Sequence, residues 1–226
     1  MPTSFELPDV SGVVLGVLGG TGDLGRGLAA RFAAAGQQVV IGSRDAERAV
    51  AAAQSLPLGG GSVRGADNLE CARAADVVVV AVPWDGHAAL LEGCGEALDG
   101  KVVVDCVNPL GFDERGAYAL PVEEGSACLQ AQRLLPGSRV VGAFHHISAV
   151  VLLDPQVESL DLDVMVVGDD REATDTVQAL ASRLPGVRGV YAGRLRSAAQ
   201  VEALTANLIS VNRRHRTHAG IRVTGL

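Results

Sequence analysis

The chain has 226 residues, of which 48% are hydrophobic, and its net charge is −7. This length suits one large domain, or one domain with a small addition, and the apolar content suffices for a sizeable core. The negative charge argues against a nucleic-acid binder. No apolar run reaches the roughly twenty residues that span a bilayer, and residues 1–9 are polar and acidic rather than a signal sequence. We therefore expect a cytoplasmic protein that contacts neither membranes nor nucleic acids.

The cysteines of the chain are Cys71, Cys94, Cys106 and Cys128. They form no CxxC pair and have no histidine at the spacing of a metal site. This pattern favours reduced thiols in a cytosolic protein over a disulfide framework or a zinc site. The sequence thus predicts neither disulfides nor a bound metal.

Short Val- and Ile-rich runs alternate with helical patterns along the chain. The runs are continuous, which is typical of strands buried on both faces of a sheet. The alternation predicts right-handed βαβ units, and so an α/β fold of Rossmann type with a doubly wound parallel sheet and a small C-terminal helical part. Strands are expected over residues 13–18, 38–41, 62–64, 77–82, 102–106, 139–143, 164–167 and 189–191. Helices are expected over residues 22–35, 45–55, 69–74, 87–98, 126–134, 170–184 and about 195–211.

We expect two parts in the chain. A nucleotide-binding domain covers residues 10–150, and a smaller C-terminal part, α/β to helical, covers residues 151–226. Gly36 follows the first helix, where a left-handed residue often ends a helix. Residues 58–62 are glycine-rich and predict a flexible loop. Residues 111–125 predict a long irregular loop, a type that is often functional.

A glycine turn joins the first expected strand to the first expected helix. Gly20, Gly22 and Gly25 fit the pattern GxGxxG, and Gly19 fits a second register of the same kind. Side chains here would keep the backbone away from a pyrophosphate, and the helix N-terminus supplies N–H donors and partial positive charge. The strand–turn–helix context favours dinucleotide binding over the alternative, a turn with a structural role only.

Ser43 and Arg44 follow the second expected strand, where the adenosine ribose lies in this fold. An NAD site has a carboxylate there for the ribose 2′-hydroxyl, whereas a hydroxyl and a guanidinium suit a 2′-phosphate. Arg48 lies one helical turn after Arg44 on the same face. These residues favour NADP(H), and the alternative is a set of solvated surface side chains.

Further candidate residues follow the later strands, at the carboxyl edge of the sheet where ligands bind in this fold. Pro83 stiffens the loop after residues 77–82, and His87 either contacts the cofactor or only begins the next helix. Asn108 follows residues 102–106. Of His145 and His146, at most one is expected to face the site, and a structural hydrogen-bonded pair is the alternative.

A basic segment, residues 213–218, ends the last expected helix. Cations at this position offset the dipole at the C-terminus of a helix. Because runs of charge are usually solvated, a solvated helix end and an anion site are both open.

Together these residues resemble the NADPH-dependent reductases of the deazaflavin coenzyme F420 (F420H2:NADP oxidoreductases) over nearly the whole chain. The resemblance implies two cofactors, NADP(H) and F420, with the deazaflavin ring over the nicotinamide between the nucleotide-binding domain and the C-terminal part. Gly86 is a departure, because the family places a histidine directly after its Trp-acid pair. The motifs that carry the resemblance are residues 18–25, Gly42 with Ser43 and Arg44, Val82 with Pro83 and Trp84, Phe144 and His145 with Ile147, and residues 201–205 with Asn207.

The resemblance also implies a reaction and a set of contacts. The reaction is direct hydride transfer between nicotinamide C4 and deazaflavin C5, for which the cofactors supply the chemistry. No catalytic side chain is therefore expected, although His145 is a candidate for stabilising charge on the reduced deazaflavin. The contacts are Thr21, Gly22, Asp23 and Leu24 for the pyrophosphate, Ser43, Arg44 and Arg48 for the 2′-phosphate, Val82, Leu110 and Ala149 for the nicotinamide side, and Ala219 and Gly220 for the deazaflavin.

Two alternative functions stay open. Another NADPH-dependent reductase, acting on a small imine or carbonyl, would carry a large helical C-terminal domain, often with a catalytic lysine. This chain has one expected helix and no lysine after residue 195. A non-catalytic NADP(H) sensor would keep the same nucleotide cradle. We also expect a homodimer, because the apolar face of the last helix needs a partner.

Overall fold

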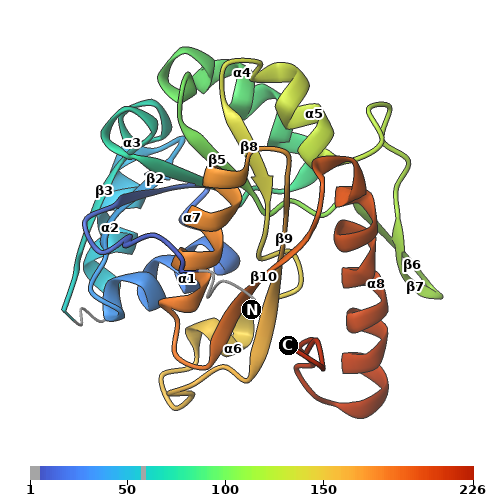
Figure 1. Cartoon of the computed structure of the whole chain (residues 1–226). Coiled ribbons are helices and arrows are strands. Elements are labelled where there is room, and N and C mark those ends of the chain that lie inside the picture. Colours follow the sequence, from blue (N-terminus) through green and yellow to red (C-terminus); the bar gives the residue numbers. More distant parts are fainter. Residues whose placement is uncertain (1–5, 57–59) are drawn as a thin grey trace.

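Eight strands form one sheet in the computed structural model, which describes residues 6–56 and 60–226. Their order is β10-β9-β8-β5-β4-β1-β2-β3, and all neighbours from β8 to β3 run parallel (Figure 1). The predicted Rossmann-type α/β class is confirmed, whereas the expected loop over residues 58–62 lies partly outside the described residues. The strands are β1 Val14–Leu18, β2 Gln38–Ser43, β3 Ser62–Asp67, β4 Val77–Val80, β5 Val102–Asp105, β8 Arg139–Gly142, β9 Leu162–Gly168 and β10 Val187–Gly193.

Helices cover both faces of this sheet. One face packs against α1, α2, α6 and α7, and the other packs against α3, α4, α5 and the start of α8. Val77 and Val79 point to the first face and Val78 and Val80 to the second, which is why β4 is a continuous valine run. The helices are α1 Asp23–Ala34, α2 Ala46–Ser55, α3 Asn68–Ala74, α4 His87–Leu98, α5 Ala127–Leu134, α6 Ala149–Leu153, α7 Arg171–Ser182 and α8 Ala198–His215, with single 3-10 turns at Trp84–Gly86 and Leu195–Ser197.

The sheet is mixed, which corrects the prediction of a wholly parallel sheet. β9 runs antiparallel to β8 and pairs with it only near Val141 and Gly142. The helix in this connection, α6, has five residues and does not carry the chain back along the sheet as a parallel crossover requires. Arg31 of α1 donates to the carbonyls of Val151 and Leu152, so tertiary contacts hold α6, which the sequence pattern did not predict.

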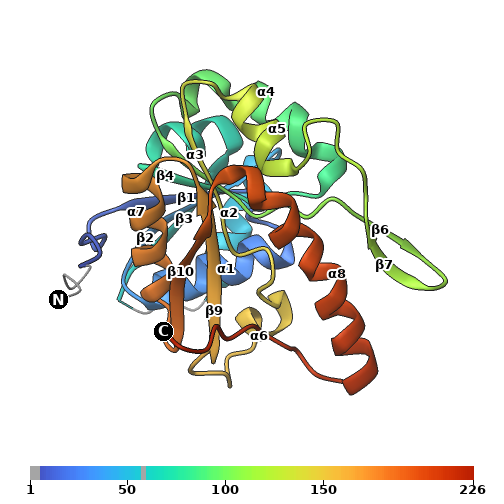
Figure 2. The same cartoon turned by 45° about the vertical axis from the view of Figure 1, so that its right-hand side comes forward.

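The stretch expected to be an irregular loop contains a hairpin. β6 Leu110–Asp113 pairs antiparallel with β7 Gly116–Ala119, and Gly116 has a φ of 124° that suits the turn. The hairpin extends away from the sheet beside α8 (Figure 2). Its aromatic side chains Phe112 and Tyr118 are 69% and 46% exposed.

Residues 151–226 contribute β9, α7, β10 and α8. The two strands continue the same sheet, while α8 stands to one side of it with the β6–β7 hairpin (Figures 1 and 2). The division of the chain at residue 150 stays a prediction. Among the described residues, no helix combines the length and the apolar character needed to cross a membrane.

Candidate functional site

The glycine turn lies at the carboxyl edge of the sheet, between β1 and α1. Gly19 has a φ of 74°, and a Cβ there would lie 2.5 Å from Val82 Cγ1. Gly20 N donates to Gly42 O at 3.0 Å, which ties the turn to β2. A Cβ on Gly25 would lie 2.7 Å from Gly20 Cα. Packing of the turn itself therefore requires glycine at positions 19 and 25.

Packing does not explain the glycine at position 22. A Cβ there would meet only Gly19 O, at an ordinary contact distance of 3.5 Å, and the residue is exposed at the N-terminus of α1. No side chain caps α1, whereas Asp45 caps α2 and Asp67 caps α3. The first N–H groups of α1 are therefore available to an anion. The other residues predicted to contact a pyrophosphate lie at the same helix start: Thr21, Asp23 and Leu24.

Ser43, Arg44 and Arg48 lie where β2 leads into α2. Both arginines are exposed, and neither forms an ion pair with an acid among residues 6–56 and 60–226. Ser43 is 6% exposed, and its hydroxyl accepts a hydrogen bond from Asp45 N at 3.3 Å. Two unpaired guanidiniums beside the ribose position suit a 2′-phosphate, and this contact stays a prediction.

The loop after β4 touches the glycine turn. β4 ends at Val80 rather than at Val82, and Ala81 N donates to Leu18 O at 3.0 Å. The side chain of Val82 lies against Gly19, and Pro83 precedes the Trp84–Gly86 turn. Val82 therefore lies beside the glycine turn, and the contacts of Val82 and Pro83 with the nicotinamide side stay predictions.

Three segments meet at the carbonyl of His145. Asn108 Nδ2 donates to it at 2.8 Å, and Thr205 Oγ1 of α8 donates to it at 2.9 Å. Phe144 has a φ of 62°, a conformation that costs a bulky residue about 1–2 kcal/mol. Its ring packs edge-on against Phe32, with 5.9 Å between centroids. The loop after β8 is thus held in a strained conformation at the ligand-binding edge, which is where such strain tends to be functional.

His87 is fully buried at the start of α4. Its Nε2 lies 2.6 Å from Asp105 Oδ2, and its Nδ1 lies 2.9 Å from Gln130 Oε1. Burial alone would lower the pKa of His87, but the hydrogen bond to Asp105 and the charge of that carboxylate raise it overall. The geometry favours the alternative in which His87 begins a helix and has a structural role below the carboxyl edge of the sheet.

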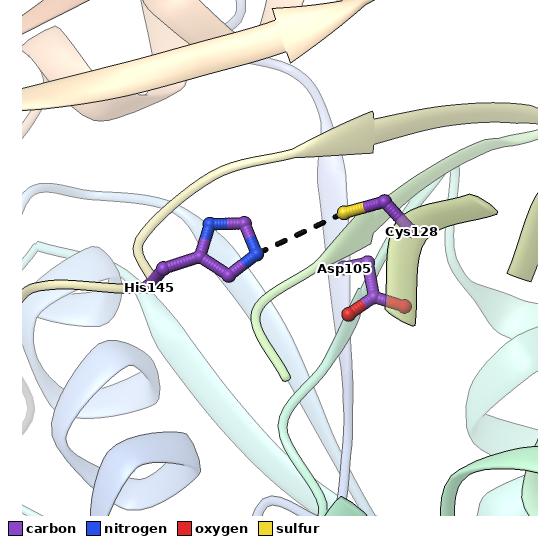
Figure 3. Close-up of side chains that lie close together, drawn as sticks. All are labelled: Asp105, Cys128 and His145. Atoms are coloured by element: carbon purple, nitrogen blue, oxygen red, sulfur yellow. Dashed lines mark hydrogen bonds between the residues drawn. The ribbon is translucent and has the colours of Figure 1, made fainter. Parts of the chain in front are cut away.

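Asp105, Cys128 and His145 form a buried cluster under the same edge (Figure 3). Their metal-ligand atoms lie within 4.8 Å of one another, and Cys128 Sγ lies 3.8 Å from His145 Nε2. The carboxylate of Asp105 already accepts hydrogen bonds at both oxygens, from His87 and from Val107 N at 2.9 Å. Burial raises the pKa of Cys128 well above its usual value, which favours the neutral thiol when no ion is bound. The cluster fits hydrogen bonding better than metal binding.

His145 and His146 are 2% and 4% exposed, respectively. Burial lowers the pKa of each to about 4, so both are neutral near pH 7. They contact different elements, because His146 Nε2 accepts from Met165 N at 3.2 Å whereas His145 faces Cys128. Neither side chain is open to the surface, and the hydrogen-bonded pair considered from the sequence is not formed.

The remaining predicted contact residues lie on segments around this edge. Leu110 begins β6 and Ala149 begins α6, and both are half-buried. His218 Nδ1 lies 3.4 Å from Ser148 Oγ. The segment that carries Ala219 and Gly220 therefore lies beside the segment that carries Ala149.

The sequence did not predict the structural roles of three residues that stabilise this edge. Asp105 was not singled out, and Glu202 and Thr205 entered only as part of the motif that carries the resemblance. Glu202 of α8 is 3% exposed, and its carboxylate accepts from Ala127 N at 3.0 Å and Cys128 N at 3.1 Å at the start of α5. Burial raises the pKa of Glu202. The sequence did hold one signal: Asp105 ends a continuous valine run, and a buried carboxylate needs partners.

Comparisons with known proteins agree with this arrangement. Residues 14–109 match the family model of the coenzyme F420-dependent NADP oxidoreductases. The F420-dependent NADP reductase of Methanothermobacter thermautotrophicus is 42% identical over 221 residues, which cover 94% of this chain and 95% of that relative. The reductase of the same name from Methanocaldococcus jannaschii is 34% identical, with 94% and 98% covered. A crystal structure from Arthrobacter sp. FB24, assigned as an F420-dependent NADP reductase, has a TM-score of 0.80 and 29% identity and covers 94% of this chain and 100% of its own. The chain therefore belongs to the family of F420-dependent NADP reductases.

Proposed function

We propose that this chain catalyses reversible hydride transfer between NADP(H) and coenzyme F420. The observation that carries the proposal is the similarity, over nearly the full length of both chains, to reductases named for both cofactors. The glycine turn and the unpaired arginines of the described residues support it independently, because they suit a phosphorylated dinucleotide.

The residues around α1 and α2 fit NADP(H). Space beside Gly22 lets a phosphate approach the backbone, and the uncapped start of α1 offers N–H donors. Arg44 and Arg48 supply positive charge for the 2′-phosphate. The hydroxyl of Ser43 accepts a hydrogen bond from Asp45 N and so orders the turn from β2 into α2. We assign the pyrophosphate to the backbone of Thr21, Gly22, Asp23 and Leu24.

The cofactors supply the hydride chemistry when bound, so the chain needs no nucleophile. Its task is to hold two rings at a near-attack distance, roughly 3–3.5 Å, and to exclude water. Small or apolar side chains suit this task because they neither accept the hydride nor exchange protons. We assign Val82, Pro83, Leu110 and Ala149 to the nicotinamide side, and Ala219 and Gly220 to the deazaflavin side.

His145 acts through its backbone in this proposal. Since burial lowers its pKa to about 4, the imidazole is neutral near pH 7 and offers no positive charge to the reduced deazaflavin. Its carbonyl instead joins Asn108 to Thr205, which fixes the loop leading to Ala149. His145 is therefore a positioning residue, and the carboxylate of Asp105, which bonds His87, lies in the same buried cluster.

The alternative functions are not favoured. An imine or carbonyl reductase with a catalytic lysine would need one at this edge, but Lys101 is the only lysine in the chain. Its ammonium donates to the carbonyls of Ala72, Arg73 and Ala75, which makes it structural. A sensor without catalysis lacks support from the relatives, which are named as reductases.

We also propose a homodimer in the cytoplasm. Val211 of α8 is exposed, and the neighbouring hairpin carries exposed Phe112 on one face and exposed Tyr118 on the other, so apolar side chains are available to a second copy. The four free, buried cysteines suit a reducing compartment. Light scattering that gives the monomer mass at working concentration would overturn the dimer.

The test of the function is a spectroscopic assay. Purified protein is mixed with NADPH and oxidised F420, and the visible absorption band of the deazaflavin is followed. We expect the band to bleach with NADPH and to bleach far more slowly with NADH. A band that persists with both, in protein that binds NADPH, would reject the reductase and leave the sensor.

A further inference from the structure

Asp163 of β9 is a fully buried carboxylate with two arginine partners. Arg188 Nε and Nη2 donate to its two oxygens, each at 2.7 Å, and Arg222 Nη1 donates to Oδ1 at 2.6 Å. Val223 N donates to Oδ2 at 2.7 Å. The pKa of Asp163 is well below its usual range, and the largest cause is hydrogen bonding from Arg188. Asp163 is therefore ionised near pH 7.

Arg188 lies on the neighbouring strand β10, whereas Arg222 and Val223 belong to the last segment of the chain, residues 216–226, which we call the C-terminal strap. α8 ends at His215, and Arg216, with a φ of 53°, turns the chain back. The strap returns from the end of α8 to β9 and β10 (Figure 2). There Asp163 N donates to Ile221 O at 2.7 Å, and Arg188 Nη2 donates to Val223 O at 3.0 Å.

The strap occupies an edge of β9 that β8 leaves open. β8 pairs with β9 only at Val167 and Gly168. Farther along the same strand, Met165 N bonds the imidazole of His146 and Asp163 N bonds the strap. The loop after β8 and the strap thus take successive places on β9, and the contact between Ser148 and His218 joins them.

Ala219 and Gly220 lie between fixed points of the strap. Ala219 N donates to Asn212 Oδ1 of α8 at 2.6 Å. Gly220 lies so close to β9 that a Cβ would be 2.8 Å from Leu162 Cβ. Their position relative to Ala149 therefore depends on the bonds that hold the strap to Asp163.

We propose that Asp163, through Arg188 and Arg222, is a positioning residue that fixes the strap as one wall of the F420 site and so sets the affinity for F420. The inference rests on the proposed function. The NADP(H) cradle is built on β1 and β2, which β4, β5 and β8 separate from β9. Loss of the clamp therefore weakens F420 and leaves NADPH binding unchanged.

Asp163→Asn tests the clamp, because it removes the charge at constant shape. Asp161→Asn is the matched control: Asp161 also pairs with Arg222, but its side chain is 90% exposed. We expect faster hydrogen exchange over residues 216–226, and a KM for F420 raised about tenfold or more, in Asp163→Asn only. The Kd for NADPH, titrated in the absence of F420, is expected to stay within about twofold of wild type.

Each result has a distinct meaning. A released strap with an unchanged KM for F420, an equal loss of NADPH affinity, or unchanged exchange would overturn the inference. Arg222→Gln, which keeps the pair of Asp163 with Arg188, serves if Asp163→Asn does not fold, and it is expected to shift both readouts in the same direction by less. A wild-type protein that does not reduce F420 would instead overturn the proposed function and, with it, the role of the strap in that site.

Discussion

Arg44→Ala is expected to weaken NADPH binding and to leave NADH binding unchanged. Arg44 is exposed where β2 ends, and it has no acidic partner within the described part of the chain, so its guanidinium can pair with a 2′-phosphate that NADH lacks. A charge-assisted hydrogen bond contributes about 1.5–3 kcal/mol. Because solvent and salt screen an exposed contact, the lower value applies, which corresponds to a Kd raised about tenfold. Arg48 lies one turn along and is assigned to the same phosphate, so the double variant is expected to weaken NADPH further, but not by the simple product of the two single effects.

Fluorescence titration with NADPH and NADH measures these changes. Arg73→Ala is the control, because Arg73 is an exposed arginine in the last turn of α3, at the opposite end of that helix from the ligand-binding edge. Added salt should narrow the difference between wild type and Arg44→Ala. Equal weakening of NADPH and NADH, or no weakening of either, would refute the assignment of the 2′-phosphate to Arg44.

Three further outcomes are expected. Gly22→Ala should leave Tm within about 2 °C of wild type but weaken NADPH binding about tenfold or more. Gly20→Ala should lower Tm clearly, because the new Cβ would lie 2.8 Å from atoms of β1 and β2. Calorimetry and titration of both variants check this. The free energy of unfolding should fall as pH drops from 6.5 towards about 4. His145 and His146 have pKa values of about 4 in the folded state, so these two side chains are protonated in the unfolded chain at a higher pH than in the folded chain. A free energy of unfolding in urea that does not change over this pH range would contradict the prediction. Glu202→Ala should cost about 1–3 kcal/mol of unfolding free energy, because two N–H groups at the start of α5 lose their acceptor; unchanged denaturation midpoints would count against this role.

Local patterns predicted most of the fold because they follow from burial. The valine run of β4 is buried on both faces, and its continuity is visible in the sequence. The end of α1 shortly before Gly36, which has a φ of 92°, follows from the conformational freedom of glycine. Such features depend on a residue and its near neighbours, and a pattern in the chain is enough to find them.

Features that depend on distant partners were not predictable in this way. The direction of β9 follows from a short connection whose helix is held by Arg31, a residue 120 positions away from one of the carbonyls it binds. The sequence left open whether His87 contacts the cofactor or begins a helix, because its partners Asp105 and Gln130 are distant in the chain. Asp163 gave no signal at all, because Arg188 lies beside it only when β10 pairs with β9, and Arg222 reaches it only when the strap folds back.

The candidate site shows the same difference between local features and features that depend on distant residues. Gly22, Arg44 and Arg48 could be predicted from the sequence because a nucleotide cradle uses one βαβ unit, whose residues are close along the chain. The F420 side, as we propose it, draws on the loop after β8, on α8 and on the strap, which are far apart in the chain. Only the resemblance to a known family pointed to Ala149, Ala219 and Gly220, and their contacts with the deazaflavin stay predictions.

Transfer of deuterium tests the central claim most directly. NADPH that carries deuterium at nicotinamide C4 is incubated with the protein and oxidised F420, and the reduced deazaflavin is examined by mass spectrometry. If the protein holds the two rings together and excludes water, the deuterium will appear at deazaflavin C5 in each turnover from the labelled face. Reduced F420 that carries only solvent hydrogen, with either face of the nicotinamide labelled, would contradict direct transfer and the two-cofactor site.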